Sequence, residues 1–388
     1  MRIGTSLRSW NFRLVALFLI GLTLGIGAIH ARDDDDRDER GEWGAVFTLT
    51  NDLAGNELAV FVRDAQGKLV APVLIPTGGL GTGGGLGNQG AIALGSDSQY
   101  LYAVNPGSNT ITVFQLGRNG PRAIQVISSG GKLPISLTIN DELLYVLNAG
   151  GSVAGGTDSI AGFDIGENGK LTPKRNSVAG LSAVSTGPAQ ISFSPSGEVL
   201  VVTEKATNTI TLFGVNNKGL PTARKSVASK GQTPFGFGFP RGELLVVSEA
   251  FGGGANASAV SSYRLDEETS SLRTISASVP TTETAACWIA STANGKFTYA
   301  ANTGSRSVTG YQIGDSGKLS ILNADGVTAL TGAAPTDLTI LGNGVLYVLN
   351  NGAASVGVYS IDKNGALTAV QPGVAGLPLT HPTGLVVR

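Results

Sequence analysis

The sequence predicts an all-β protein, a seven-bladed β-propeller of four-stranded antiparallel blades. Three observations support this: a glycine-rich composition with few charges, a repeat of about 50 residues, and two chain ends that resemble neighbouring strands of one sheet. The 388 residues include 56 glycines, and only 14% are charged. Because glycine lowers helix stability at interior positions, this composition favours strands joined by turns.

The first 31 residues are typical of a secretory signal peptide. Arg2, Arg8 and Arg13 precede an apolar run at 14–29, and Ala31 stands directly before a charged segment. A basic start, an apolar middle and a small residue at the cut define such peptides. We therefore expect residues 1–31 to be removed and the protein to be secreted or periplasmic. An uncleaved anchor is the alternative, although the run is shorter than the roughly 20 residues of a membrane span.

Residues 32–43 are predicted to be an acidic, disordered linker, because RDDDDRDER at 32–40 is low in complexity and highly charged. A cation site is the alternative interpretation of this stretch. Of the 27 basic residues, the three arginines named above lie within 1–31, which leaves 24 against 28 acidic ones. This balance gives no reason to expect nucleic-acid binding. We expect a monomer that does not associate with a membrane after cleavage.

Seven repeats fill residues 44–388, and each reads as four strands. In 187–231, GPAQISFSPSG, EVLVVTE, NTITLFGV and LPTARKSVASKG are the four segments, and NNKG marks a tight turn between the last two. A polar residue ends the second strand of each repeat: Asn51, Asn105, Asn148, Glu204, Glu249, Asn302 and Asn350. An aromatic residue closes the third: Phe61, Phe114, Phe163, Phe213, Tyr263, Tyr311 and Tyr359.

The two chain ends predict that the ring is closed by the C-terminal strand. A single four-stranded unit cannot bury both of its faces, whereas units arranged around an axis bury them against each other. Residues 44–51 match a second strand of the repeat, and residues 381–388 match a first strand. The last strand should therefore complete the blade that the first ordered strand begins, which also protects its edge.

One mouth of the ring should gather the candidate site residues. In an antiparallel meander the start of the first strand and the end of the second lie on the same side, and ligands commonly bind in such concave openings. His381 lies just before the closing strand, on this mouth. The first strands start near Ala91, Ser136, Gln190, Gly236, Trp288, Asp337 and Gly384.

Glu204 and Glu249 are the predicted catalytic residues. They replace asparagine at the ends of second strands in adjacent repeats, and two nearby carboxylates can form a general acid/base pair. The alternatives are solvated rim charges or a pair with Lys205. The predicted ligand-binding residues are Gln190, Trp288, Asp337 and His381; Trp288 either stacks on a ligand or plugs the channel.

Other chemistries find little support in the sequence. Cys287 is the single cysteine, and residues after the predicted cleavage site contain one histidine, so we expect neither Cys/His catalysis nor a metal site. No cofactor is expected. GLGTGG at 79–84 matches a dinucleotide-binding pattern but lacks the strand–helix context, so we interpret it as a flexible loop.

Residues 44–388, and most specifically GPAQISFSPSGEVLVVTEKATNTITLF at 187–213, resemble the lactonase-like seven-bladed propellers, which include bacterial 6-phosphogluconolactonases and fungal carboxymuconate cyclases. LLYVLN (143–148) and VLYVLN (345–350) resemble the related YVTN-type repeats. The resemblance implies the propeller fold and lactone hydrolysis, with Glu204 matching a glutamate of the family. Ala189 and Gln190, however, stand where catalytic members have Arg-His after Gly-Pro, and Thr303 stands where they have arginine.

These departures leave the enzymatic activity open. The leading hypothesis is an exported lactonase-like propeller that binds a small polar ligand, such as a lactone or a sugar-derived acid, with or without hydrolysing it. The alternative is a non-catalytic propeller that serves as a scaffold for a protein or polymer outside the cytoplasm.

Overall fold

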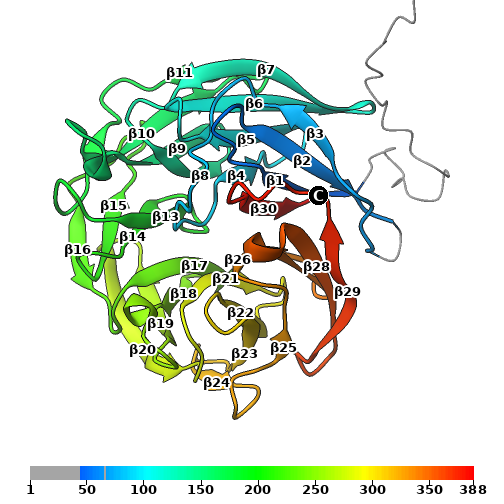
Figure 1. The fold of residues 1–388 in the computed structure, drawn as a ribbon. Coiled ribbons are helices and arrows are strands. Elements are labelled where there is room, and N and C mark those ends of the chain that lie inside the picture. The colour runs from blue at the N-terminus through cyan, green and yellow to red at the C-terminus, as the bar shows by residue number, and fades with distance from the viewer. Residues whose placement is uncertain (1–43, 65–66) are drawn as a thin grey trace, which may run out of the picture.

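Seven antiparallel sheets surround a central axis in the computed structural model, which describes residues 44–64 and 67–388 (Figure 1). This confirms the predicted seven-bladed propeller. The predictions of a signal peptide and an acidic linker concern residues 1–43 and lie outside the described residues. Among the described residues, no helix has the length and apolar character that a membrane crossing requires.

The blades are numbered here in chain order, and their strands are given from the axis outward. Blade 1 contains β30 (Thr383–Val387), β1 (Ala45–Leu49), β2 (Glu57–Val62) and β3 (Val73–Pro76). Blade 2 contains β4 (Ile92–Leu94), β5 (Tyr100–Asn105), β6 (Thr110–Gly117) and β7 (Gly120–Ser128). Blade 3 contains β8 (Pro134–Asn140), β9 (Leu143–Ala149), β10 (Asp158–Ile165), β11 (Leu171–Pro173) and β12 (Ala179–Gly180).

Blade 4 contains β13 (Pro188–Phe193), β14 (Val199–Glu204), β15 (Thr209–Gly214) and β16 (Lys225–Ala228). Blade 5 contains β17 (Pro234–Arg241), β18 (Leu244–Glu249), β19 (Ala259–Asp266) and β20 (Ser271–Pro280). Blade 6 contains β21 (Ala286–Ser291), β22 (Phe297–Asn302), β23 (Ser307–Ile313), β24 (Leu319–Ile321) and β25 (Ala329–Leu330). Blade 7 contains β26 (Pro335–Leu341), β27 (Val345–Asn350), β28 (Ser355–Ile361) and β29 (Leu367–Ala375).

The second strand of each blade is buried on both faces, because each blade packs between two others. In β5, Leu101, Tyr102, Ala103 and Val104 are all buried. Such strands read as continuous apolar runs, in contrast to the alternation of half-buried strands. This explains why stretches such as LLYVLN recur along the chain.

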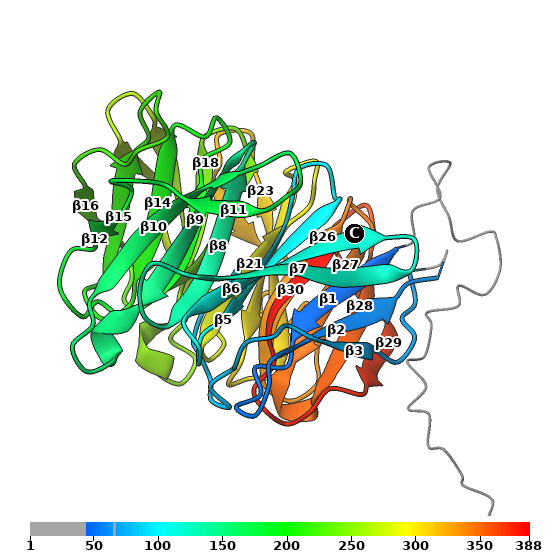
Figure 2. The ribbon, with the colours of Figure 1, turned by 90° about the horizontal axis from the view of Figure 1, so that it is seen from above.

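The closing strand joins the two ends of the described chain. β30 pairs antiparallel with β1, with Val387 opposite Val46 and Val386 opposite Phe47, and the two strands lie side by side in Figure 2. The backbone N–H of Arg388 also donates to the carbonyl of Ala45 at 2.9 Å. The predicted closure is therefore confirmed.

Tyrosine hydroxyls connect four blades to the next blade around the ring. Each of these tyrosines lies on a second strand and donates to the carbonyl of a glycine in the turn between strands three and four of the neighbour. The glycines have positive φ angles of 69–85°, which only glycine adopts at low cost. The bonds are Tyr102–Gly169 (2.9 Å), Tyr145–Gly219 (2.8 Å), Tyr299–Gly365 (2.9 Å) and Tyr347–Gly67 (3.0 Å).

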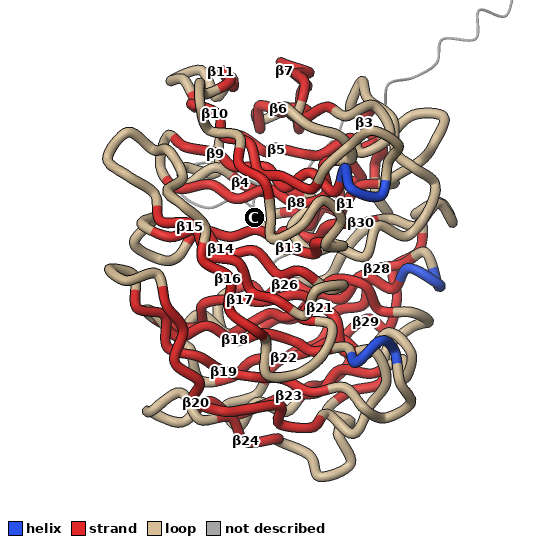
Figure 3. Tube along the Cα trace, turned by 90° about the vertical axis from the view of Figure 1, so that its left-hand side faces the viewer, coloured by secondary structure: helices blue, strands red, loops and turns tan. Residues whose placement is uncertain are grey.

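One face of the ring carries all the loops that follow second strands. Three of these loops contain a short 3-10 turn, η2 (Gly150–Ser152), η3 (Phe251–Gly253) and η4 (Asn351–Ala353). Figure 3 shows these turns along a single edge of the molecule. This face is the mouth that the sequence predicts.

An axial segment, residues 85–91, fills the centre of the ring before β4 begins. Gln89 spans the axis: its Nε2 donates to the carbonyl of Ile289 at 2.8 Å, and the Ile289 N–H donates to its Oε1 at 3.1 Å. Its backbone N–H donates to the carbonyl of Ala189 in blade 4 at 3.1 Å. At Gly90, with φ +81°, a Cβ would lie only 2.9 Å from Oγ of Ser136. The backbone could not approach blade 3 this closely with a larger residue.

The glycine-rich run at 79–84 leads into this segment. It is a loop, as predicted, but its backbone is fastened to blade 1. The N–H of Gly81 donates to the carbonyl of Asp52, and that of Gly83 donates to the carbonyl of Asn51, both at 2.8 Å. These bonds and the contacts of the axial segment argue against the expected flexibility.

Candidate functional site

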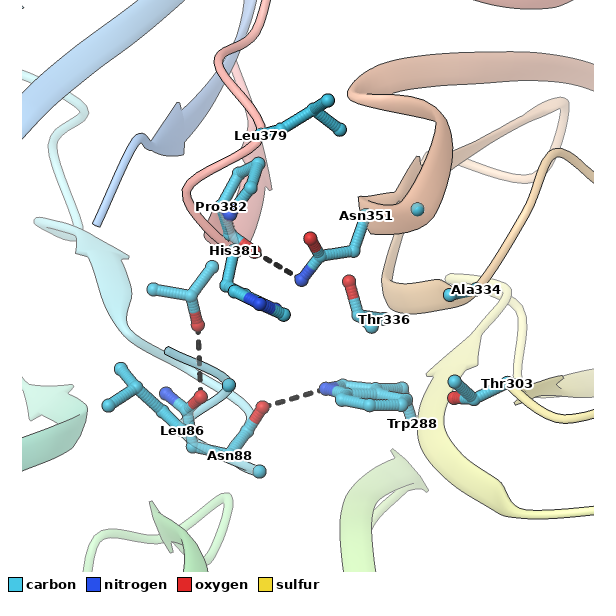
Figure 4. Close-up of a pocket in the computed structure, with 14 residues that line it drawn as sticks. Leu86, Asn88, Trp288, Thr303, Ala334, Thr336, Asn351, Leu379, His381 and Pro382 are labelled. Carbon is cyan, nitrogen blue, oxygen red and sulfur yellow. Dashed lines mark hydrogen bonds between the residues drawn. The ribbon is translucent and has the colours of Figure 1, made fainter. Parts of the chain in front are cut away.

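A pocket of about 470 Å³ opens on the mouth beside the axial segment (Figure 4). Its walls come from five places in the chain: the axial segment, the start of β21, the loop after β22, blade 7 and the segment that leads into β30. Trp288 and His381 line it, and both were predicted from the sequence as ligand-binding residues. The size is within the usual range for small-molecule sites.

Trp288 forms one wall of the pocket and also holds the axial segment. Its Nε1 donates to the carbonyl of Asn88 at 2.7 Å, and its ring lies 5.0 Å from that of Phe235, centroid to centroid. The indole is therefore fixed before any ligand arrives. The two roles left open by the sequence, stacking surface and channel plug, are compatible in this geometry.

His381 reaches the pocket from a left-handed backbone position, with φ +58°. Its carbonyl accepts a hydrogen bond from Nδ2 of Asn51 at 3.3 Å, and the neighbouring Thr380 hydroxyl donates to the carbonyl of Thr50 at 2.7 Å. These contacts to blade 1 hold the loop in place. In Figure 4 the imidazole points toward Thr336 and Trp288.

Two further polar residues of blade 7 line the pocket and were not predicted. The buried hydroxyl oxygen of Thr336 has no hydrogen-bond partner among the described residues. Asn351 donates from Nδ2 to the carbonyl of Pro382 at 3.3 Å. Each adjoins a residue that the repeat pattern marks, Asp337 and Asn350, so a shift of one position along the pattern would have found them.

Glu204 does not line the pocket; its buried carboxylate is occupied by donors from its own blade and the preceding loop. Oε1 accepts the Thr211 hydroxyl at 2.6 Å and the Ser182 N–H at 3.1 Å. Oε2 accepts the Thr207 hydroxyl at 2.9 Å and also that of Ser182. A carboxylate with this many donors fastens the strand end, so the geometry favours a structural role.

Glu249 has the same surroundings in blade 5 and is likewise absent from the pocket wall. Its Oε1 accepts the Ser261 hydroxyl at 2.6 Å and the Gly231 N–H at 2.8 Å, and its Oε2 accepts the Ser278 hydroxyl at 2.6 Å. The two glutamates therefore serve separate blades and do not form a pair at the pocket. Their catalytic role stays a prediction that this geometry does not favour.

Gln190 and Asp337 lie on inner strands, where they connect one blade with the next. Gln190 donates from Nε2 to the carbonyl of Phe237 at 3.1 Å and accepts the Phe237 N–H at 2.7 Å. The carboxyl of Asp337 faces the backbone N–H groups of Leu338 and Leu385, and burial raises the pKa of Asp337 well above its ordinary value. Neither residue lines the pocket, so their ligand-binding role stays a prediction.

Lys205 and Cys287 lie close to the pocket but do not line it. Nζ of Lys205 donates to the carbonyl of Gly87 and lies 4.8 Å from the centroid of the Phe235 ring. Burial lowers the pKa of Lys205 to about 8. Burial also raises the pKa of the Cys287 thiol to about 12, which keeps it protonated and unreactive as a nucleophile at neutral pH.

Comparison with protein families decides the relationship. The sequence model of the lactonase seven-bladed β-propellers matches residues 46–185, 159–287 and 250–378. The chain belongs to this lactonase family. Comparison of this lactonase-family chain with curated proteins gives no significant match.

Solved structures share the fold of this family member at low identity. A candidate 6-phosphogluconolactonase from Bacteroides fragilis is 19% identical, with a TM-score of 0.71 over 92% of this chain and 100% of that one. The periplasmic gluconolactonase of Pseudomonas aeruginosa is 16% identical, with a TM-score of 0.68 over 89% of this chain and 99% of that one. At these identities the likeness concerns the fold alone.

Proposed function

We propose that this lactonase-family propeller binds a small lactone in the mouth pocket and hydrolyses it with His381 as general base. One observation carries the proposal: the pocket contains the only imidazole among the described residues, beside the immobilised ring of Trp288. Imidazole is well suited to exchange protons near neutral pH.

The reaction needs one proton acceptor and one hydrogen-bond donor. A water molecule attacks the lactone carbonyl carbon while the imidazole of His381 takes a proton from it. The C–O bond of the ring then breaks, and the imidazolium returns the proton to the departing alkoxide, which yields a hydroxy acid. We assign the donor role to the hydroxyl of Thr336, which has no partner among the described residues and would donate to the carbonyl oxygen as negative charge develops there.

The test is turnover of D-glucono-δ-lactone, followed as acid release and corrected for spontaneous hydrolysis. His381→Gln should reduce kcat/KM by about 10² or more, the usual contribution of a general base. Glu204→Gln is the matched comparison, because it removes the competing base outside the pocket. If Glu204→Gln abolishes turnover of a folded protein and His381→Gln does not, the base is Glu204.

We also propose that the protein acts outside the cytoplasm. The basic and apolar pattern of residues 1–31 supports export, and one structural neighbour is a periplasmic protein. Cell fractionation and N-terminal sequencing test this: the mature chain should begin at Arg32. Recovery of the intact N-terminus in the cytoplasmic fraction would contradict it.

A second function, binding of a protein partner, is favoured by apolar residues around the mouth. Several large apolar side chains in mouth loops are exposed, and singly exposed ones would need no explanation. A defined partner that is captured by the protein and lost with Leu53→Ser and Leu379→Ser, without lactone turnover, would select this function. The residues are Leu53 (65% exposed), Leu80 (42%), Val153 (38%), Val184 (64%) and Leu379 (76%).

A further inference from the structure

We infer that the mouth pocket selects uncharged lactones and disfavours ligands that carry a phosphate or a carboxylate; this rests on the proposed function. The supporting observation is the character of the wall. Of the described residues that line the pocket, none is Lys, Arg, Asp or Glu. The wall consists of glycine and alanine backbone, apolar side chains, neutral polar side chains and the one imidazole.

A charged ligand would lose part of its hydration in this pocket without gaining a lysine or arginine side chain as its partner. Removing an ionised group from water costs several kcal/mol unless an opposite charge or several hydrogen bonds replace the solvent. The neutral donors at hand are few, because Trp288 Nε1 is committed to Asn88 and Thr303 Oγ1 to the carbonyl of Pro335 at 2.8 Å. The unpartnered Thr336 hydroxyl can serve one carbonyl or hydroxyl group.

Lys205 contacts a residue of the pocket wall but does not line the pocket itself. Its Nζ donates to the carbonyl oxygen of Gly87, and Gly87 itself forms part of the wall. The axial segment therefore stands between the ammonium group and the pocket. Phe235 covers the ammonium from another side, 4.8 Å away.

Apolar groups give an uncharged ring a place to bind. Trp288 offers its indole, and Leu86, Leu379 and Pro382 line the same space. A neutral lactone can place its ring against these groups and direct its carbonyl to Thr336. Hydrolysis converts this ligand into a carboxylate, so the selectivity that admits the substrate also favours release of the product.

The test compares three probes by isothermal titration calorimetry at neutral pH. The first is D-gluconolactam, which is neutral and resists hydrolysis; the second is the 6-phosphate of this lactam, and the third is gluconate. The lactam should bind at least about tenfold more tightly than either anion. Thr336→Lys places a cation in the wall and should shift the preference toward the 6-phosphate. The matched control Leu53→Lys adds the same charge on the mouth but outside the pocket, and should leave the preference unchanged.

The outcomes separate this inference from the proposed function. Binding of the 6-phosphate or gluconate as tightly as the lactam would overturn the inference and leave the pocket as a ligand site. No binding of any probe, to the wild type or to Thr336→Lys, would overturn the proposed function and the inference with it. An equal shift of preference in Leu53→Lys would show that overall charge, and not the wall, sets the selectivity.

Discussion

Lys205 gives a quantitative prediction about stability and pH. The change is Lys205→Met, which keeps the length of the side chain and removes its charge. In the folded protein burial lowers the pKa of Lys205 from 10.5 to about 8. Folding therefore carries the cost of a buried cation at neutral pH, and the difference between the two pKa values corresponds to about 3 kcal/mol. The Phe235 ring stabilises the cation, so this figure is an upper limit.

The sign follows from proton binding in the two states. Below pH 8 both states hold the proton, and the native state bears the full cost. Between about pH 8 and 10.5 the native amine loses its proton while the unfolded chain keeps it, so stability rises with pH. At pH 9.5 the wild type should have gained about 2 kcal/mol relative to Lys205→Met, compared with the difference between the two proteins at pH 7.

Urea unfolding of both proteins at pH 7, 8, 9 and 9.5 measures this difference. Tyrosine and cysteine titrate over part of the same range, but they are common to both proteins and cancel in the comparison. A difference in unfolding free energy that stays constant with pH, or that falls as pH rises, would refute the reasoning, because it would mean that the ammonium of Lys205 is not destabilised by burial.

Three further predictions concern the fold. Deletion of residues 383–388 removes β30 but keeps His381. It should remove a large part of the unfolding free energy, which is about 5–15 kcal/mol in typical domains. An unchanged urea midpoint would contradict the role of the closing strand. Glu204→Gln places an amide donor among the hydroxyl and N–H donors of blade 4, so calorimetry should show a loss of about 1–3 kcal/mol, with lactone turnover unchanged per folded molecule. Asp337→Asn should raise the melting temperature at pH 7 by a few degrees: burial raises the pKa of Asp337, so the native state binds the proton more tightly than the unfolded chain, and the wild type loses stability as pH rises above the ordinary carboxyl pKa. That advantage should vanish near pH 3, and an equal effect at both pH values would exclude titration of Asp337 as its cause.

The sequence was sufficient for the fold because the repeat encodes it several times over. Each blade carries the same buried second strand with a polar residue at its end, and six of the seven have a glycine in the turn between the third and fourth strands, so the repeat stays recognisable where one copy departs from it. The predicted starts of the first strands lie within two residues of the observed ones, for example Trp288 against β21 at Ala286 and Gly384 against β30 at Thr383. The matching strand patterns at the two ends predicted the closure.

The site was predicted only in part, because the repeat gives the position of a side chain but not its direction. His381 and Trp288 were placed on the correct mouth and line the pocket. Glu204 and Glu249 were placed on the same mouth, yet their side chains turn toward hydroxyl groups of the third strands, such as Thr211 and Ser261. Thr211 and Ser261 each lie two residues after the third-strand residue that pairs with the glutamate. These hydroxyl residues are visible in the sequence and could have indicated the contact.

The axial segment was missed for a different reason. Its contacts join residues far apart in the chain, such as Gln89 with Ile289 and Asn88 with Thr383. No local pattern carries that information, and the glycines that permit the close approach also resemble those of an ordinary loop. The segment belongs to no blade, so the comparison of repeats could not reveal it.

The junction between blades 7 and 1 carries the same tyrosine bond as three other junctions of the ring. The hydroxyl of Tyr347 in blade 7 donates to the carbonyl of Gly67 in blade 1, as that of Tyr102 in blade 2 donates to the carbonyl of Gly169 in blade 3. The described chain ends also meet, since Arg388 and Ala45 exchange backbone hydrogen bonds. A circular permutant that joins these ends through a short linker and opens the chain at another blade boundary should therefore retain the architecture. The ring then does not depend on which blade comes first in the chain.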